Sequence, residues 1–105
     1  MQIITSQHYL EEAIIAEKSA SRDYGVALSP AFEVDGEFFQ VILDGHHSLA
    51  AAQRDGAEPE WIEYDRLDHD AVAWLDRGDV ETFLAAAHMG EGDYIDAITG
   101  NTIWV

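Results

Sequence analysis

The chain has 105 residues, in which 21 aspartates and glutamates stand against 5 lysines and arginines, so the formal net charge is −16. Hydrophobic residues make up 48% of the sequence, enough to form the core of one small domain over residues 1–105. So few cations argue against direct binding of DNA or RNA, because contacts with phosphates need clustered Lys and Arg. We expect a basic partner instead.

Cysteine is absent, which excludes disulfides, thiolate zinc sites and cysteine nucleophiles. The first residues lack the basic and long apolar segments of a signal peptide, and no apolar run approaches the ~20 residues that span a bilayer. We therefore expect a soluble cytoplasmic protein that does not act at a membrane.

The first two predicted elements are a strand over residues 2–5 and a helix over residues 7–20. Ser6 precedes the helix and is a favourable N-cap residue. Apolar residues then alternate up to Asp35-Gly36, and this dipeptide predicts a two-residue hairpin turn.

The strand after that turn, residues 38–43, is apolar on both faces, so we expect it inside a sheet that is covered on both sides. An Ala-rich helix over residues 47–55 follows, with Gly56 at its C-terminal end, and residues 61–64 form a short strand. This strand–helix–strand order favours parallel pairing of the two strands through a right-handed crossover.

Two further helices are predicted before Gly90, one capped by Asp68 or Asp70 and one capped by Asp79. The tail, residues 94–105, predicts a hairpin with Gly100 in its turn. The predicted class is therefore α/β (mixed α+β), with a small mixed sheet, an added helical pair and a C-terminal hairpin.

The segment that carries the most chemical information is Asp44-Gly45-His46-His47-Ser48, which lies between a strand and a helix. A helix N-terminus attracts anions, a glycine lets a ligand approach the backbone, and imidazoles donate hydrogen bonds or move protons. The alternative is structural: Asp44 caps the helix, Gly45 forms the turn, and the histidines are polar surface residues.

The same residues resemble the nucleotide-binding motif of the ParB/sulfiredoxin superfamily, in its Asp-Gly-His-His-Arg form found in ParB-like kinases of free serine. The resemblance extends over about residues 26–64. It implies a ParB-like fold that binds ATP or CTP with Mg at Asp44, Gly45, His46, His47 and Ser48. Here Ser48 replaces the arginine that grips phosphate, and His46 stands where sulfiredoxins have their reactive cysteine, which excludes sulfiredoxin chemistry.

Other catalytic and metal signals are weak. Four histidines (His46, His47, His69 and His88) lie among carboxylates, but their spacing matches no known zinc pattern, so we expect no metal site. No serine lies in a nucleophile elbow, and we identify no catalytic residue.

Acidic residues recur every two to ten residues from Gly56 to Gly100, and six aromatic residues are interleaved with them: Trp61, Tyr64, Trp74, Phe83, Tyr94 and Trp104. One interpretation is solubility alone. Another is that the carboxylates imitate the phosphates of a nucleic acid and attract a basic groove, with one or two aromatic side chains exposed as anchors. The candidate partner-binding residues are Glu58, Glu60, Glu63, Asp65, Asp68 and Asp70.

Two functions follow from these observations. The first is an acidic, non-catalytic interaction protein on a degenerate ParB-like scaffold, a nucleic-acid-mimicking inhibitor of a basic nucleic-acid-binding protein that needs no cofactor. The second is a ParB-like nucleotide-binding enzyme, either a small-molecule kinase or an NTPase.

Overall fold

The computed structural model describes residues 1–89 and 92–104, which form a mixed α+β fold, as the sequence predicts. The helices are α1 (Glu12–Ser21), α2 (His46–Asp55), α3 (Val72–Asp76) and α4 (Val80–Ala86). The strands are β1 (Gln2–Thr5), β2 (Gly25–Leu28), β3 (Phe32–Val34), β4 (Glu37–Asp44), β5 (Glu60–Glu63), β6 (Tyr94–Asp96) and β7 (Thr102–Trp104).

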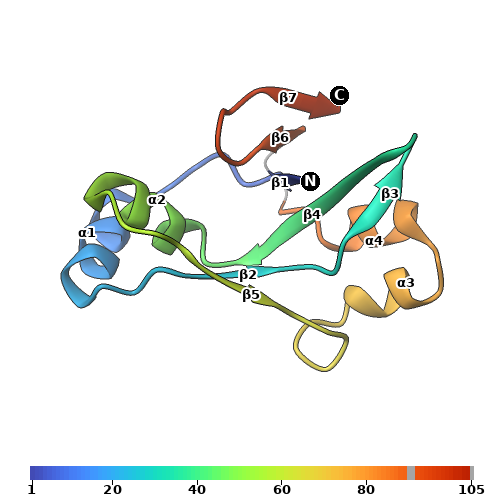
Figure 1. Cartoon of the computed structure of the whole chain (residues 1–105), viewed down its shortest axis with the longest axis horizontal. Helices are drawn as coiled ribbons and strands as arrows, with labels where there is room; N and C mark the ends of the chain where they lie inside the picture. The colour runs from blue at the N-terminus through green and yellow to red at the C-terminus, as the bar shows by residue number, and fades with distance from the viewer. Residues whose placement is uncertain (90–91, 105) are drawn as a thin grey trace.

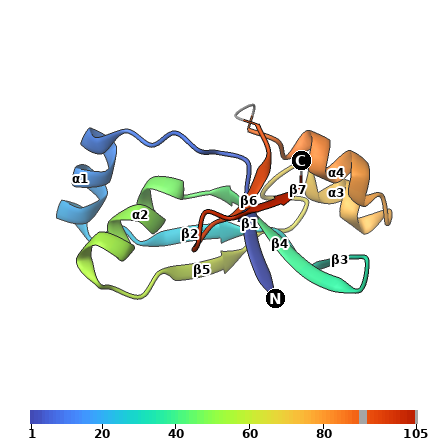
Figure 2. The ribbon, with the colours of Figure 1, turned by 90° about the horizontal axis from the view of Figure 1, so that it is seen from above.

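The strands form one mixed sheet in the order β5-β2-β4-β1-β6-β7, with β3 paired to β4 outside this order. Helices α1 and α2 lie together at one end of the molecule, and α3 and α4 lie together near the other end (Figures 1 and 2). Among the residues that the structure describes, no helix has the length and apolar character needed to cross a membrane.

Strand β4 is an inner strand that is covered on both faces, which confirms the prediction. Phe39, Val41 and Leu43 are buried in a cluster with side chains of α3 and α4. Ile42, which points to the opposite face, packs in a second cluster with Leu49 of α2. The apolar run in β4 therefore contributes to two cores, one with α3 and α4 and the other with α2.

Both predicted hairpins form. Asp35 and Gly36 have φ angles of 52° and 85°, the left-handed conformations that a type I′ turn needs between β3 and β4. Strands β6 and β7 pair in antiparallel fashion, and Gly100 in their connection has a φ of 81°. Residue 105, which the predicted tail included, lies outside the described residues.

The predicted parallel pairing of residues 38–43 with residues 61–64 is wrong. Strand β4 pairs in parallel with β1 and antiparallel with β2, and β5 pairs in parallel with β2 at the edge of the sheet. The reason is that β2 is a separate strand, which ends before Pro30 and lies between β4 and β5. The sequence pattern does not separate it from β3.

Two predicted helix starts are also wrong because the proposed caps bond elsewhere. Ser6 is buried, and its Oγ accepts a hydrogen bond from the distant Met89 N–H at 2.8 Å, so α1 begins at Glu12. Asp68 bonds within the turn before α3, which has Ala71 at its N-cap position, and Asp70 does not cap the helix either.

The last predicted cap is confirmed. Asp79 is the N-cap residue of α4, and its Oδ1 accepts a hydrogen bond from the Thr82 N–H at 3.0 Å. The predicted helix end at Gly90 lies outside the described residues.

Candidate functional site

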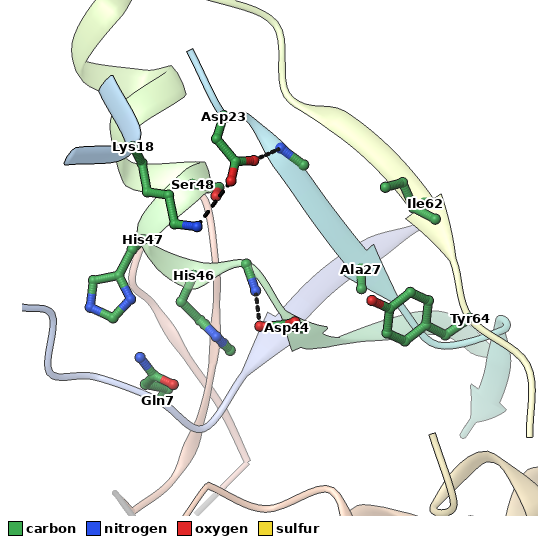
Figure 3. Close-up of a pocket in the computed structure, with 12 residues that line it drawn as sticks. Gln7, Lys18, Asp23, Ala27, Asp44, His46, His47, Ser48, Ile62 and Tyr64 are labelled. Atoms are coloured by element: carbon green, nitrogen blue, oxygen red, sulfur yellow. Dashed lines mark hydrogen bonds and ion pairs between the residues drawn. The ribbon is translucent and has the colours of Figure 1, made fainter. Parts of the chain in front are cut away.

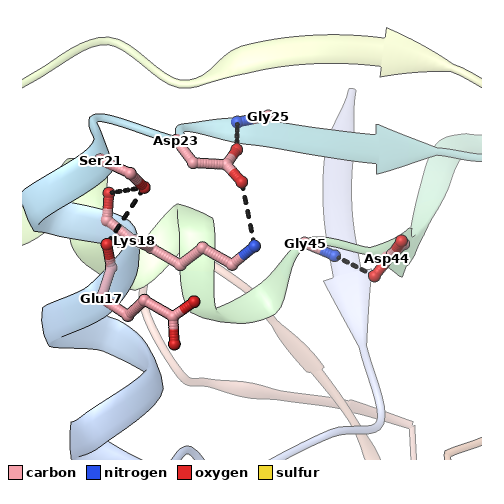
Figure 4. Close-up of polar contacts among 7 residues, drawn as sticks. All are labelled: Glu17, Lys18, Ser21, Asp23, Gly25, Asp44 and Gly45. Carbon is pink, nitrogen blue, oxygen red and sulfur yellow. Dashed lines mark hydrogen bonds and ion pairs between the residues drawn. The ribbon is translucent and has the colours of Figure 1, made fainter.

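The turn at the N-terminus of α2 forms as predicted, but Gly45 is required by packing within the chain. Its φ is 92°, and a Cβ atom on it would lie 2.4 Å from the carbonyl oxygen of Gly25 in β2. Asp44 Oδ1 accepts the N–H of Gly45 at 2.8 Å, and no side chain caps α2 (Figure 4). The glycine therefore lets the turn pack against β2, and the proposed cap by Asp44 does not form.

His46 is a buried residue that joins α2 to the sheet. Only 8% of its surface is exposed, and its Nε2 lies 2.6 Å from the hydroxyl oxygen of Thr5 in β1. Burial lowers the pKa of His46 to about 4, so the ring is neutral at pH 7. A neutral imidazole supplies no positive charge to a phosphate.

His47 joins α2 to the start of α1. Its Nε2 accepts the main-chain N–H of Glu11, the N-cap residue of α1, at 3.1 Å. The interpretation of both histidines as merely polar surface residues is therefore wrong, since each connects two elements.

Sequence reasoning missed a cation beside this turn. Lys18 of α1 points toward α2, and its Nζ forms an ion pair with Asp23 Oδ2 at 2.9 Å (Figures 3 and 4). This hydrogen bond is the main cause that lowers the pKa of Asp23 and raises the pKa of Lys18. The sequence around Lys18 contains no recognisable motif, because the packing of α1 against α2 is what places this side chain beside the turn.

A pocket of about 490 Å³ lies beside this turn. Its lining includes Lys18, Asp23 and the whole predicted motif, Asp44, Gly45, His46, His47 and Ser48. Figure 3 shows Lys18, His46, His47 and Ser48 on one side of the pocket and Ala27, Ile62 and Tyr64 of the β2–β5 region on the other. Ser48 is 2% exposed, and its hydroxyl contributes to the lowered pKa of Asp23.

The charges of this pocket do not fit a magnesium-bound triphosphate. Lys18 is the cation that lines it, and Asp23 and Asp44 offset that charge. Within residues 1–89 and 92–104, no group of three or more His, Asp or Glu side chains is placed to hold a metal ion. With one lysine against two aspartates, the pocket has no excess of positive charge to attract a triphosphate.

The six predicted partner-binding acids are all exposed and follow one continuous stretch of chain, from the end of α2 through β5 to the turn before α3. Glu60 and Glu63 lie on β5, where alternate side chains point to opposite faces, so these two carboxylates flank the strand on both sides. Glu60 and Glu63 therefore do not share one flat face of the sheet.

Two of the six acids also shape the local backbone. Asp65 Oδ1 accepts the N–H groups of Leu67 and Asp68, at 2.8 and 3.3 Å. Asp68 Oδ2 in turn accepts the N–H of Asp65 at 3.0 Å. These bonds stabilise the turn that follows β5.

Large apolar side chains are exposed in the same stretch. Trp61 is 40% exposed, Ile62 is 43% exposed, and Leu67 is 88% exposed. Of the other aromatic residues that lie among the acids, Phe83 and Tyr94 are buried in the core, and Trp74 and Trp104 pack against it. The structure thus identifies Trp61 as the exposed aromatic residue of the acidic segment.

Comparison with known proteins adds no relative: no protein-family model, no curated protein and no solved structure matches this chain. The ParB/sulfiredoxin resemblance therefore stays a prediction that rests on the motif residues.

Proposed function

We propose that this chain is an acidic, non-catalytic interaction protein of the cytoplasm that binds a basic, nucleic-acid-binding protein and competes with its nucleic acid. The observation that carries the proposal is the pairing of apolar and acidic side chains on β5. Trp61 and Ile62 are both at least 40% exposed, and Glu60 and Glu63 flank them in the same strand.

The two kinds of side chain have different physical roles in such a surface. Carboxylates on a chain with a net charge of −16 attract a basic partner over long distances and speed its association. Exposed tryptophan and isoleucine supply apolar area, which gives affinity that salt does not screen. A surface that serves only solubility does not need exposed apolar side chains.

The alternative function, a ParB-like nucleotide-binding enzyme, has less support. His46 is buried and bonded to Thr5, and His47 accepts a hydrogen bond from the Glu11 N–H. Gly45 packs closely against Gly25. Each residue of the motif that we expected to contact phosphate thus has a role inside the fold.

A comparison of two charge-reversed variants tests the proposal. Glu60→Lys/Glu63→Lys changes β5, whereas Glu33→Lys/Glu37→Lys makes the same change in charge on exposed positions of the β3–β4 hairpin. The tagged chain and both variants are used to capture proteins from the native lysate, and the captured protein is tested for binding to labelled nucleic acid.

We expect the unchanged chain and the hairpin variant to capture the same basic protein, to release it as salt rises, and to displace its nucleic acid. The β5 variant should fail in all three. Equal capture by both variants, capture that salt does not weaken, or a partner that keeps its nucleic acid would contradict the proposal.

A further inference from the structure

The outer edge of β5 offers main-chain hydrogen-bonding groups to a further strand. Glu60 N–H bonds to the Tyr24 carbonyl oxygen and Tyr64 N–H bonds to the Leu28 carbonyl oxygen, each at 2.8 Å, on the side of β2. Because main-chain groups alternate in direction along a strand, the N–H and C=O groups of Trp61 and Glu63 point away from β2. Among the described residues, no strand pairs with that side.

The other outer strands of the sheet are less suited to this role. Strand β3 has three residues, of which Phe32 is buried, and β7 has three, of which two are partly buried. All four residues of β5 are exposed, and β5 lies at the border of the ribbon in both views (Figures 1 and 2). The edge of β5 is thus the most accessible to another chain.

We propose that β5 receives an extended basic segment of the partner as an additional strand of the sheet. This inference rests on the proposed function and specifies how the partner is held. Main-chain hydrogen bonds to Trp61 and Glu63 would give affinity, and side chains on the two faces would give specificity, as in other cases of strand addition.

The order of residues in β5 defines the chemistry of the incoming segment. The strand reads acidic, apolar, apolar, acidic from Glu60 to Glu63. Directly opposite residues interact most strongly, so the complementary segment reads basic, apolar, apolar, basic. Because this pattern is the same in both directions, it fits whether the incoming strand is parallel or antiparallel.

The same charges disfavour a second copy of this chain on the edge. Antiparallel pairing of two β5 strands in register would place Glu60 of each copy opposite Glu63 of the other, and like charges that face each other destabilise a pair of strands. Each copy also carries a net charge of −16. Charged residues at a sheet edge commonly prevent self-association in this way.

Hydrogen exchange with a synthetic peptide tests the inference. The probe is a short peptide with a central Lys-Val-Val-Lys, and the control is the same peptide with Lys-Gly-Gly-Lys, which has equal charge and poor strand propensity. Amide exchange is followed residue by residue in the full chain. We expect the Lys-Val-Val-Lys peptide to slow exchange at Trp61 and Glu63 at least tenfold, because those N–H groups face outward in the free chain.

Two methylated peptides separate strand pairing from charge attraction. N-methyl groups on alternate residues remove either the amides that face β5 or those that face away. The peptide that lacks the amides facing β5 should bind at least tenfold more weakly than the unmethylated peptide, and the other should bind like it.

Several outcomes would overturn the inference. If the peptide binds while Trp61 and Glu63 exchange as before, or if both methylated peptides bind equally, strand addition is wrong. The same holds if no basic peptide binds. Slower exchange that depends on protein concentration without peptide would instead show a second copy on the edge. The capture experiment with the β5 and hairpin variants does not depend on the peptide, so it decides the proposed function separately.

Discussion

The hydroxyl oxygen of Thr5 lies 2.6 Å from Nε2 of His46, and this contact joins the first strand of the sheet to the first turn of α2. The same hydroxyl oxygen accepts the N–H of Gln7 at 3.0 Å, so its own hydrogen is available to the imidazole. The pair holds a neutral, buried histidine in the place where the sequence suggested a phosphate contact. This relationship makes the stability of the fold depend on pH.

We expect acid to destabilise the chain through His46. In the unfolded chain this imidazole gains its proton near the usual pKa of 6.5, whereas burial lowers its pKa in the folded chain to about 4. Between these values the unfolded state binds more protons. The stabilisation that the neutral His46 gives the folded state is thus complete above pH 6.5 and is lost as the pH falls to 4. It amounts to roughly 3 kcal/mol, at 1.36 kcal/mol per pKa unit.

Urea unfolding between pH 4 and 7, for the unchanged chain and for His46→Gln, measures this effect. The variant should be less stable at pH 7, and its stability should fall less steeply with acid. Parallel pH curves would show that His46 does not titrate as its burial requires.

Replacement of Gly45 by alanine should be far more costly than replacement of Gly56. Both glycines have a positive φ, 92° and 64°, but a Cβ on Gly45 would lie 2.4 Å from the Gly25 carbonyl oxygen, whereas a Cβ on Gly56 meets nothing within 4 Å. We expect about 1 kcal/mol of lost stability for Gly56→Ala and about 3 kcal/mol or more for Gly45→Ala. Equilibrium denaturation of both variants provides the comparison, and equal losses would mean that the turn can move away from β2.

Millimolar ATP, CTP or ADP with magnesium should leave the melting temperature unchanged. Lys18 is paired with Asp23, and Asp44 adds a second carboxylate to the same pocket, so no net positive charge attracts phosphate. A ligand that binds the folded chain raises its melting temperature. A rise that disappears in Lys18→Gln would instead support the nucleotide-binding function.

The exposed side chains of β5 should matter little for folding. Trp61→Thr removes a side chain of a residue that is 40% exposed, at an edge where threonine is well accommodated, so we expect a loss of about 1 kcal/mol or less. Phe83→Ala, at a site that is fully buried between α4 and the sheet, should cost about 3 to 5 kcal/mol. Thermal melting distinguishes the two, and a large loss for Trp61→Thr would assign that residue to the core.

Much of the fold follows from local patterns in the sequence. The turn at Asp35-Gly36, the apolar strand β4, the cap at Asp79 and the hairpin around Gly100 all arise from preferences that operate over a few residues. Such signals survive in any tertiary context that does not oppose them. The mixed α+β class could therefore be predicted without a structure.

Pairing and bonding partners that are far apart in the sequence could not be predicted in this way. Ser6 is an excellent cap residue by type, yet its hydroxyl bonds to Met89. Strand β2 separates β4 from β5, which removes the expected crossover. In each case a contact between residues far apart in the sequence outweighs the local preference.

For the candidate site, the sequence by itself determined which residues would meet at the start of α2 and that residues 58–70 would be acidic. Only the tertiary structure decided what those residues do. Packing buried His46 against Thr5, placed Lys18 in the pocket at the start of α2, and left Trp61 exposed on an edge strand. Solvation and ion pairing depend on which segments meet in space, and a one-dimensional pattern does not contain that information.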